Sequence, residues 1–184
     1  MKRLATVLAL VGTCVLATTV DVTPASALET YEAQMQASDA ASQARIDMIE
    51  AFGPKELRPG QYVWRDVPDE AGPERVVISL SDQMAYVYRG DTIMAATTIS
   101  SGRDSKPTPS GIFSVLNKTP MYRSKKYDNA PMPYAEFFEP HGIALHAGYV
   151  GEEPNSHGCV HLPAAFAKKL YSITDIGTPV IIGA

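Results

Sequence analysis

Cysteine is nearly absent from this sequence. The 184 residues contain two cysteines, Cys14 and Cys159, so a small fold held by several disulfides is excluded. A basic surplus is also missing: 16 Lys and Arg stand against 20 Asp and Glu, for a net charge of −4, which argues against nucleic acid as a partner. No internal repeat and no glycine-rich phosphate loop is found. The length is close to that of one domain.

Charge is also lacking near the N-terminus, where residues 4–20 form an apolar run. Two basic residues precede it, and Ala25-Ser26-Ala27 follows it. This order predicts a signal peptide, residues 1–27, with cleavage after Ala27. An uncleaved anchor is the alternative, but the Thr and Gly residues in the run and the small-residue site favour cleavage. Thr13 before Cys14 argues against lipidation.

Export leaves Cys159 as the only cysteine of the mature chain. We expect the protein in the periplasm or at the extracellular face of the envelope, without stable membrane insertion after cleavage. A lone thiol in an oxidising compartment is either buried and inert or present for its chemistry.

Residues 28–73 are predicted to form a helical leader and a proline-rich linker. The helix covers 28 to about 52 and stops at Gly53-Pro54. Its larger apolar residues are scattered, so we interpret it as a stalk outside the main core. Within the linker only residues 62–64 are strand-like.

Residues 74–184 are predicted to form the main domain. Short runs of period two, rich in β-branched and aromatic residues, predict strands at 75–80, 84–88 and 92–100, and further short runs predict strands at 111–117, 143–146 and 177–182. Residues 164–170 form a short helix after Pro163, and 119–133 form a long loop of the kind that serves as a lid or binding element. The expected fold is mainly β, a compact sandwich or barrel with one short internal helix.

All four histidines lie within 21 residues that also contain Cys159: His141, His146, His157 and His161. A cysteine nucleophile needs a neighbour that takes its proton. His146 ends an apolar strand, where a scaffold holds a side chain rigidly, and is the expected general base. His157 lies two residues from Cys159 and is expected to assist or to stabilise the loop. His141 lies in a turn.

A zinc site is the competing interpretation. In an extended segment His157, Cys159 and His161 share one face, and His146 could be a fourth ligand. Two-residue spacing is not the usual ligand pattern, and a fully ligated zinc would leave no open position for catalysis. We therefore predict neither a metal nor another cofactor.

Two segments resemble the active-site signature of the L,D-transpeptidase (YkuD) family: His146-Ala147-Gly148-Tyr149 and Ser156-His157-Gly158-Cys159-Val160. The resemblance covers about residues 74–183. It also includes blocks at residues 101–102, 108–113, 130–134 and 177–180.

The resemblance implies a cell-wall enzyme that acts on peptidoglycan stem peptides. Cys159 would attack the carbonyl before the terminal D-Ala of a tetrapeptide stem, and the resulting thioester would pass to the amine of a neighbouring stem as a 3,3 cross-link. His146 would be the base. Backbone N–H groups at Gly158 and Cys159 would form the oxyanion hole, supported by Ser156 and His157.

His161 departs from the family pattern, because many members have arginine there, which suits a substrate carboxylate. We expect His161 and Tyr134 to contact substrate. Two alternatives stay open: an L,D-carboxypeptidase, in which water accepts the acyl group, and a wall-binding module with an inert cysteine.

Overall fold

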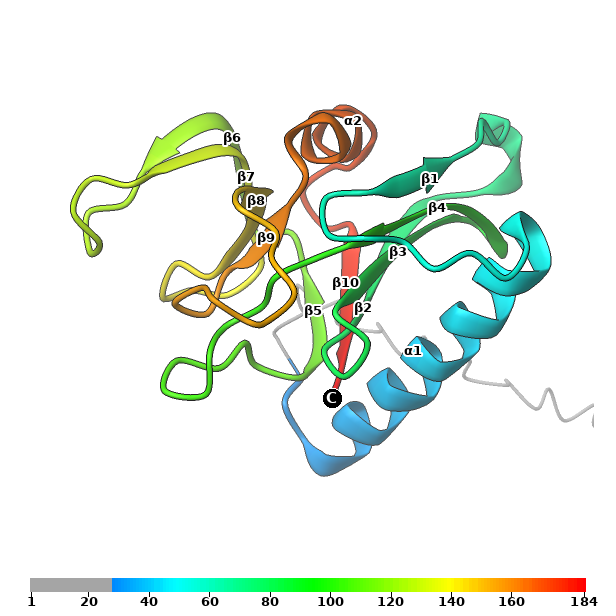
Figure 1. The fold of residues 1–184 in the computed structure, drawn as a ribbon, viewed down its shortest axis with the longest axis horizontal. Coiled ribbons are helices and arrows are strands. Elements are labelled where there is room, and N and C mark those ends of the chain that lie inside the picture. The colour runs from blue at the N-terminus through cyan, green and yellow to red at the C-terminus, as the bar shows by residue number, and fades with distance from the viewer. Residues whose placement is uncertain (1–27) are drawn as a thin grey trace, which may run out of the picture.

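The computed structural model describes residues 28–184, and the predicted signal peptide lies outside them. Two sheets face each other across an apolar core (Figure 1). The larger sheet has the spatial order β1 (Tyr62–Trp64), β4 (Thr92–Thr98), β3 (Met84–Arg89), β2 (Glu74–Ser79), β10 (Pro179–Gly183), β5 (Gly111–Ser114). The smaller sheet has the order β6 (Asn117–Arg123), β7 (Pro131–Phe137), β8 (Ala144–Ala147), β9 (Val160–Leu162). The prediction of a mainly β fold is confirmed.

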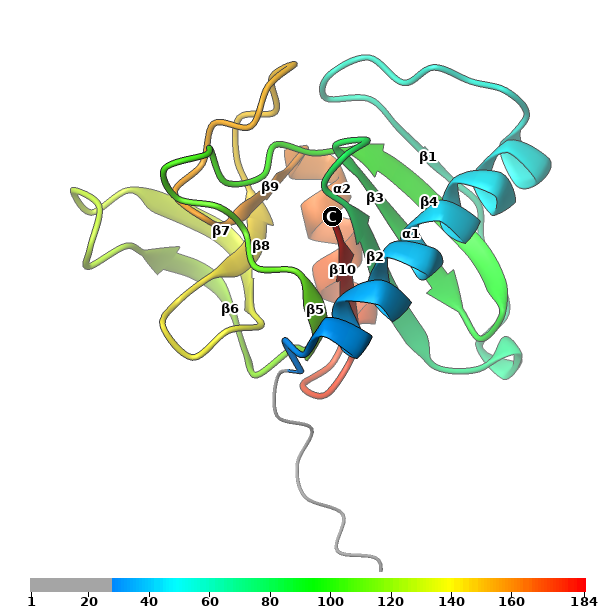
Figure 2. The ribbon, with the colours of Figure 1, turned by 90° about the horizontal axis from the view of Figure 1, so that it is seen from below.

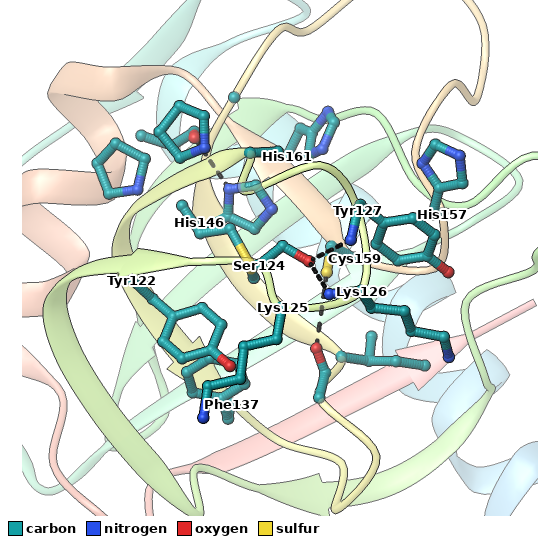
Figure 3. Close-up of a pocket in the computed structure, with 18 of the residues that line it drawn as sticks. Tyr122, Ser124, Lys125, Lys126, Tyr127, Phe137, His146, His157, Cys159 and His161 are labelled. Atoms are coloured by element: carbon teal, nitrogen blue, oxygen red, sulfur yellow. Dashed lines mark hydrogen bonds between the residues drawn. The ribbon is translucent and has the colours of Figure 1, made fainter.

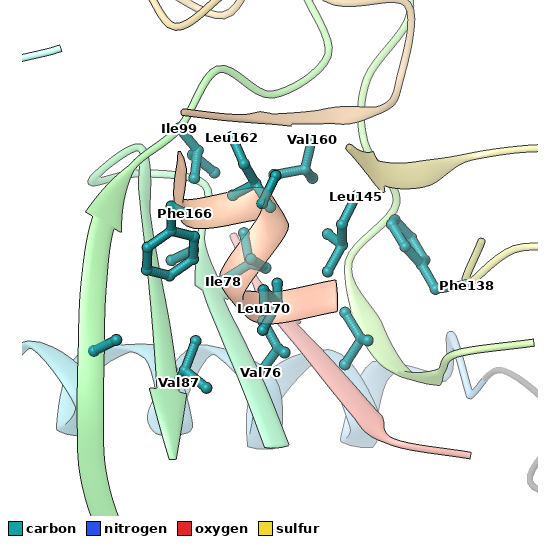
Figure 4. Packing of buried hydrophobic residues seen from close by; sticks show 14 of the residues in the cluster. Val76, Ile78, Val87, Ile99, Phe138, Leu145, Val160, Leu162, Phe166 and Leu170 are labelled. Atoms are coloured by element: carbon teal, nitrogen blue, oxygen red, sulfur yellow. The ribbon is translucent and has the colours of Figure 1, made fainter. Parts of the chain in front are cut away.

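Helix α2 (Ala164–Ile173) lies against the space between the sheets. Phe166 and Leu170, both almost fully buried, turn toward the strands of both sheets (Figure 4). They meet Val76 and Ile78 of β2 and Leu145 of β8 in one continuous cluster. This core thus fixes the smaller sheet, including β8, to the larger sheet.

Helix α1 (Tyr31–Phe52) covers the other face of the larger sheet (Figure 2). Thr30 caps its first turn, since its hydroxyl accepts a hydrogen bond from the Ala33 N–H at 3.2 Å. The buried face consists of Ala33, Ala37, Ala41, Ala44 and Met48. The expectation of a stalk outside the core is wrong: an alanine face has little hydrophobicity but allows the helix to approach the sheet closely.

Both faces of the central strands are therefore covered, which explains their sequences. β2, β3 and β4 are buried along almost their whole length, and strands covered on both sides are apolar runs more than alternating patterns. A 3₁₀ turn, η1 (Asp69–Ala71), precedes β2.

The segment predicted as a long loop is a hairpin. β6 and β7 pair antiparallel, from Asn117 opposite Phe137 to Arg123 opposite Pro131. The pattern was hidden because β6 is an edge strand with mostly exposed side chains, and because prolines are rare inside strands. The outer half of the hairpin projects past β8, since β7 pairs with β8 only through Glu136 and Phe137.

Substitution of Gly183 in β10 tests how closely α1 packs against the larger sheet. A Cβ there would lie 2.6 Å from the Ala37 carbonyl oxygen and 2.8 Å from the Ala41 Cβ. Because backbone cannot move aside cheaply, we expect Gly183→Ala to lower the free energy of unfolding by about 1 to 3 kcal/mol in urea denaturation. Gln36→Ala, on the exposed side of the same helix, is the control. A fully stable Gly183→Ala protein would contradict this packing.

Glu136 of β7 is a buried carboxyl group on the core side of the smaller sheet, 1% exposed. Its Oε1 lies 2.9 Å from the Thr174 hydroxyl, while Oε2 has no partner among the described residues. Burial raises the pKa of Glu136 to about 7, although the Thr174 hydrogen bond and the charge of Lys118 oppose this. The folded protein therefore favours the protonated acid.

Stability should consequently depend on pH through Glu136. Between the ordinary pKa of 4.5 and about 7, the unfolded chain releases the proton and the folded chain keeps it, so the free energy of unfolding falls as pH rises, by about 3 kcal/mol. Glu136→Gln should be more stable than wild type at pH 8 and similar at pH 4. Glu152→Gln, the same change at an exposed position, should show no such difference. An equal gain at both pH values would contradict the assignment.

Candidate active site

The parallel pair β8 and β9 determines which side chains meet. Leu145 pairs with Val160, and His146 pairs with His161. Leu145 and Val160 are fully buried in the core. Since side chains alternate along a strand, His146, Cys159 and His161 share the opposite face.

That face is the floor of a cleft of about 880 Å³ (Figure 3). One wall is the outer half of the β6–β7 hairpin, and another is the loop that holds His141, Gly142 and Ile143. The structure thus brings together Cys159, His146, His157 and His161, all of which line the cleft.

Cys159 is partly exposed within mostly apolar surroundings. Met132, Ala135 and Ala144 form a small buried cluster against which Cys159 packs. Burial raises the pKa of the thiol above its ordinary value of 9.0, while a hydrogen bond with the Ala144 backbone opposes the shift. Sγ lies 4.0 Å from the Gly142 carbonyl oxygen, and no hydrogen bond joins it to an imidazole of the described residues. The resting group is therefore a neutral thiol.

His146 and His161 are held in the same tautomer. The Nδ1 of His146 lies 2.9 Å from the Ala147 carbonyl oxygen, and the Nδ1 of His161 lies 3.1 Å from that of Tyr149. A carbonyl oxygen only accepts, so each Nδ1 donates its hydrogen and each neutral ring keeps a lone pair on Nε2.

Burial also keeps both imidazoles neutral. It lowers the pKa of His146 to about 4, where the Ala147 hydrogen bond opposes the shift and His161 adds to it. Burial lowers the pKa of His161 as well, against its Tyr149 hydrogen bond. Near pH 7 the site holds a thiol and two free bases, and not a thiolate–imidazolium pair.

The loop before Cys159 is fixed by hydroxyl groups. The Ser156 hydroxyl donates to the Cys159 carbonyl oxygen and accepts from the Gly158 N–H at 3.1 Å. Thr108 donates to the Gly158 carbonyl oxygen at 2.8 Å. The expectation that the Gly158 N–H is free for an oxyanion is thus not met, because Ser156 occupies it. Gly158 has φ +114°, which favours glycine.

His157 lines the cleft, whereas Tyr134 does not. The exposed His157 ring contacts the ring of Tyr127 at the hairpin tip, with centroids 4.3 Å apart, so it contacts the cleft wall. Tyr134 packs against the main core and near Tyr171, with ring centroids 5.9 Å apart.

Sequence reasoning included Gly148 in the signature but did not predict its contact with His161, and it missed Thr108 and Tyr127 as parts of the site. Thr108 lies in one of the blocks that carry the family resemblance, which was a usable signal. Gly148 lies directly under the His161 ring, and Tyr127 contacts His157. Neither contact has a signature in the sequence, because both depend on how distant segments pack.

Residues 28–184 contain neither a cluster of metal ligands nor a membrane-spanning helix. No group of three or more His, Cys, Asp or Glu side chains there is arranged to hold a metal ion. No helix in that range combines the length and the apolar character needed to cross a bilayer.

Comparison with known families gives a match over residues 73–182 to the sequence profile of YkuD, the L,D-transpeptidase catalytic domain. No curated protein matches significantly. Among solved structures, an L,D-transpeptidase from Stackebrandtia nassauensis is 24% identical with a TM-score of 0.58. The alignment covers 77% of this chain and 67% of that one.

Two mycobacterial structures are also similar. An L,D-transpeptidase from Mycobacterium tuberculosis is 26% identical, with a TM-score of 0.57 and coverage of 60% of this chain and 57% of that one. L,D-transpeptidase 3 from the same organism, in complex with a faropenem-derived adduct, is 25% identical, with a TM-score of 0.55 and coverage of 61% and 60%. The chain thus spans less than two thirds of these two proteins.

The raised thiol pKa predicts slow alkylation of Cys159 at neutral pH. Because iodoacetamide reacts with the thiolate, the rate in the folded protein should keep rising with pH beyond 9, and at pH 7 it should be lower than in the urea-unfolded chain. Peptide mass mapping at Cys159 measures both rates. A rate that is already constant below pH 7 would indicate an ion pair and contradict the neutral resting state.

Proposed function

The chain belongs to the YkuD family of L,D-transpeptidase catalytic domains, and on that premise we propose that it is an exported peptidoglycan L,D-transpeptidase with Cys159 as its nucleophile. The supporting observation is the placement of Cys159 and His146 on one face of the paired strands β8 and β9, inside one cleft. Export rests on the predicted signal peptide of residues 1–27.

The acylation step begins with a neutral thiol. As Cys159 Sγ attacks the carbonyl before the terminal D-Ala of a tetrapeptide stem, its proton passes to the free Nε2 of His146. The C–N bond breaks, His146 returns the proton to the departing amine, and a thioester remains. Because the thiol pKa is high and the His146 pKa is low, proton transfer occurs together with attack and not before it.

The second step transfers the acyl group to the amine of a neighbouring stem, which forms a 3,3 cross-link and restores the thiol. Lys125 and Lys126 line the same cleft and are suited to the carboxylates of stem peptides. No step requires a cofactor.

Incubation with faropenem tests the nucleophile. Intact-protein mass spectrometry should show one covalent adduct on the wild type, and Cys159→Ser should show none. His146→Asn should slow adduct formation by about 10²- to 10⁴-fold, the usual contribution of a general base. Lys168→Ala, exposed on α2, should behave as wild type.

The acceptor is tested with a tetrapeptide-bearing disaccharide as the only substrate. A cross-linked dimer that has lost one D-Ala supports the transpeptidase, whereas the tripeptide product alone would assign an L,D-carboxypeptidase. A folded wild type that forms no adduct and no product would leave the wall-binding module and overturn the proposal.

A further inference from the structure

We propose that His161 is a second catalytic base, which takes a proton from the acceptor amine before that amine attacks the acylated Cys159. This inference rests on the proposed function. It assigns separate roles to two histidines that lie side by side in the cleft.

The two rings are arranged as a pair. His146 and His161 are direct partners in the β8–β9 register, and their ring centroids lie 4.9 Å apart at 65°. Each ring is anchored through Nδ1 to a main-chain carbonyl oxygen. Neither Nε2 has a hydrogen-bond partner among residues 28–184, so both lone pairs are available to a substrate in the cleft.

Gly148 makes room for the second ring. A Cβ at Gly148 would lie 2.7 Å from Cγ and 2.9 Å from Cδ2 of His161, closer than real contacts allow. The imidazole therefore packs directly on the backbone that follows β8, while the Tyr149 carbonyl oxygen fixes its Nδ1. His161 is held in one place, as a catalytic group must be.

The number of protons that the acceptor amine must lose calls for a second base. An alkyl amine with a pKa near 10 is an ammonium ion at neutral pH, and it must lose one proton before attack and another as the amide forms. Acylation differs, because there one proton moves from the thiol to the leaving amine. A single imidazole that is still holding the first proton cannot accept the second.

The surroundings favour this division of roles. His146 is 5% exposed, whereas His161 is partly exposed and can pass a proton to solvent. Lys125 and Lys126 face the same cleft from the hairpin, and His157 faces it from the loop before Cys159. The two lysines outweigh Asp128, which also lines the cleft, and their net positive charge disfavours the ammonium form of an incoming acceptor.

During aminolysis the acceptor ammonium group loses two protons. The ammonium group gives one proton to Nε2 of His161, which releases it to water. The neutral amine attacks the thioester carbonyl, the C–S bond breaks, and the second proton passes through Nε2 of His146 to the departing sulfur. The products are an amide, a thiol and one proton in solution.

Two rates separate this role from a structural one. Acylation is measured by adduct formation with faropenem, and aminolysis is measured by transfer of a tetrapeptide donor to D-methionine. In His161→Asn the side-chain amide can still donate to the Tyr149 carbonyl oxygen, but no base remains. We expect aminolysis to fall about 10- to 100-fold, with acylation within about threefold of wild type.

Gly148→Ala provides an independent variant, because it displaces the ring while His161 stays in the sequence. It should lower aminolysis in the same selective way. Lys168→Ala should leave both rates unchanged. Equal losses of acylation and aminolysis in His161→Asn, or no loss of aminolysis, would overturn the second base. Failure of the wild type to form an adduct would instead overturn the proposed function.

Discussion

The pairing of β8 with β9 is the constraint on which the site depends. One register places Leu145 and Val160 in the core and His146, Cys159 and His161 in the cleft. A shift by one residue would exchange the two faces and bury the reactive groups. The core prevents this, since Phe166 and Leu170 of α2 pack on the same strands. The packing on the core face of β8 and β9 thus fixes the reactive side chains on the cleft face.

The apolar surroundings of the thiol set how the site is activated. Burial raises the pKa of Cys159 and lowers the pKa of His146, so neither of these two groups carries a charge in the free site. Charge develops only when a carbonyl carbon is in position to be attacked. A neutral thiol is also less open to oxidation than a thiolate, which would suit the one cysteine of residues 28–184 in the oxidising compartment that the proposed export implies.

The sequence predicts those parts of the structure that depend on local patterns. The central strands were predicted from their β-branched and aromatic residues, although a period of two implies one buried face and both faces are buried. The clustered histidines and the family signature predicted one site for Cys159 and His146, and both line the cleft. The packing of α1 against the larger sheet was missed because alanine carries a weak hydrophobic signal. The place of Tyr134 was missed because its φ of +55° interrupts the alternation of β7 and turns the ring toward the core. The engaged Gly158 N–H follows from the position of one serine hydroxyl, which no spacing rule reveals.

The prolines of β7 restrict how a peptide can lie in the cleft. Pro131 and Pro133 have no N–H, and a proline in a ladder directs its nitrogen away from the paired strand. Beyond β8 that side of β7 is open, so it offers no donors at these positions for an added strand. The backbone at these two positions offers only carbonyl acceptors, so side chains must supply the donors that hold a ligand there. Recognition by side chains does not require a uniform backbone handedness. A cleft of this kind can therefore accommodate chains that mix D- and L-residues, which could not bind as a regular added strand.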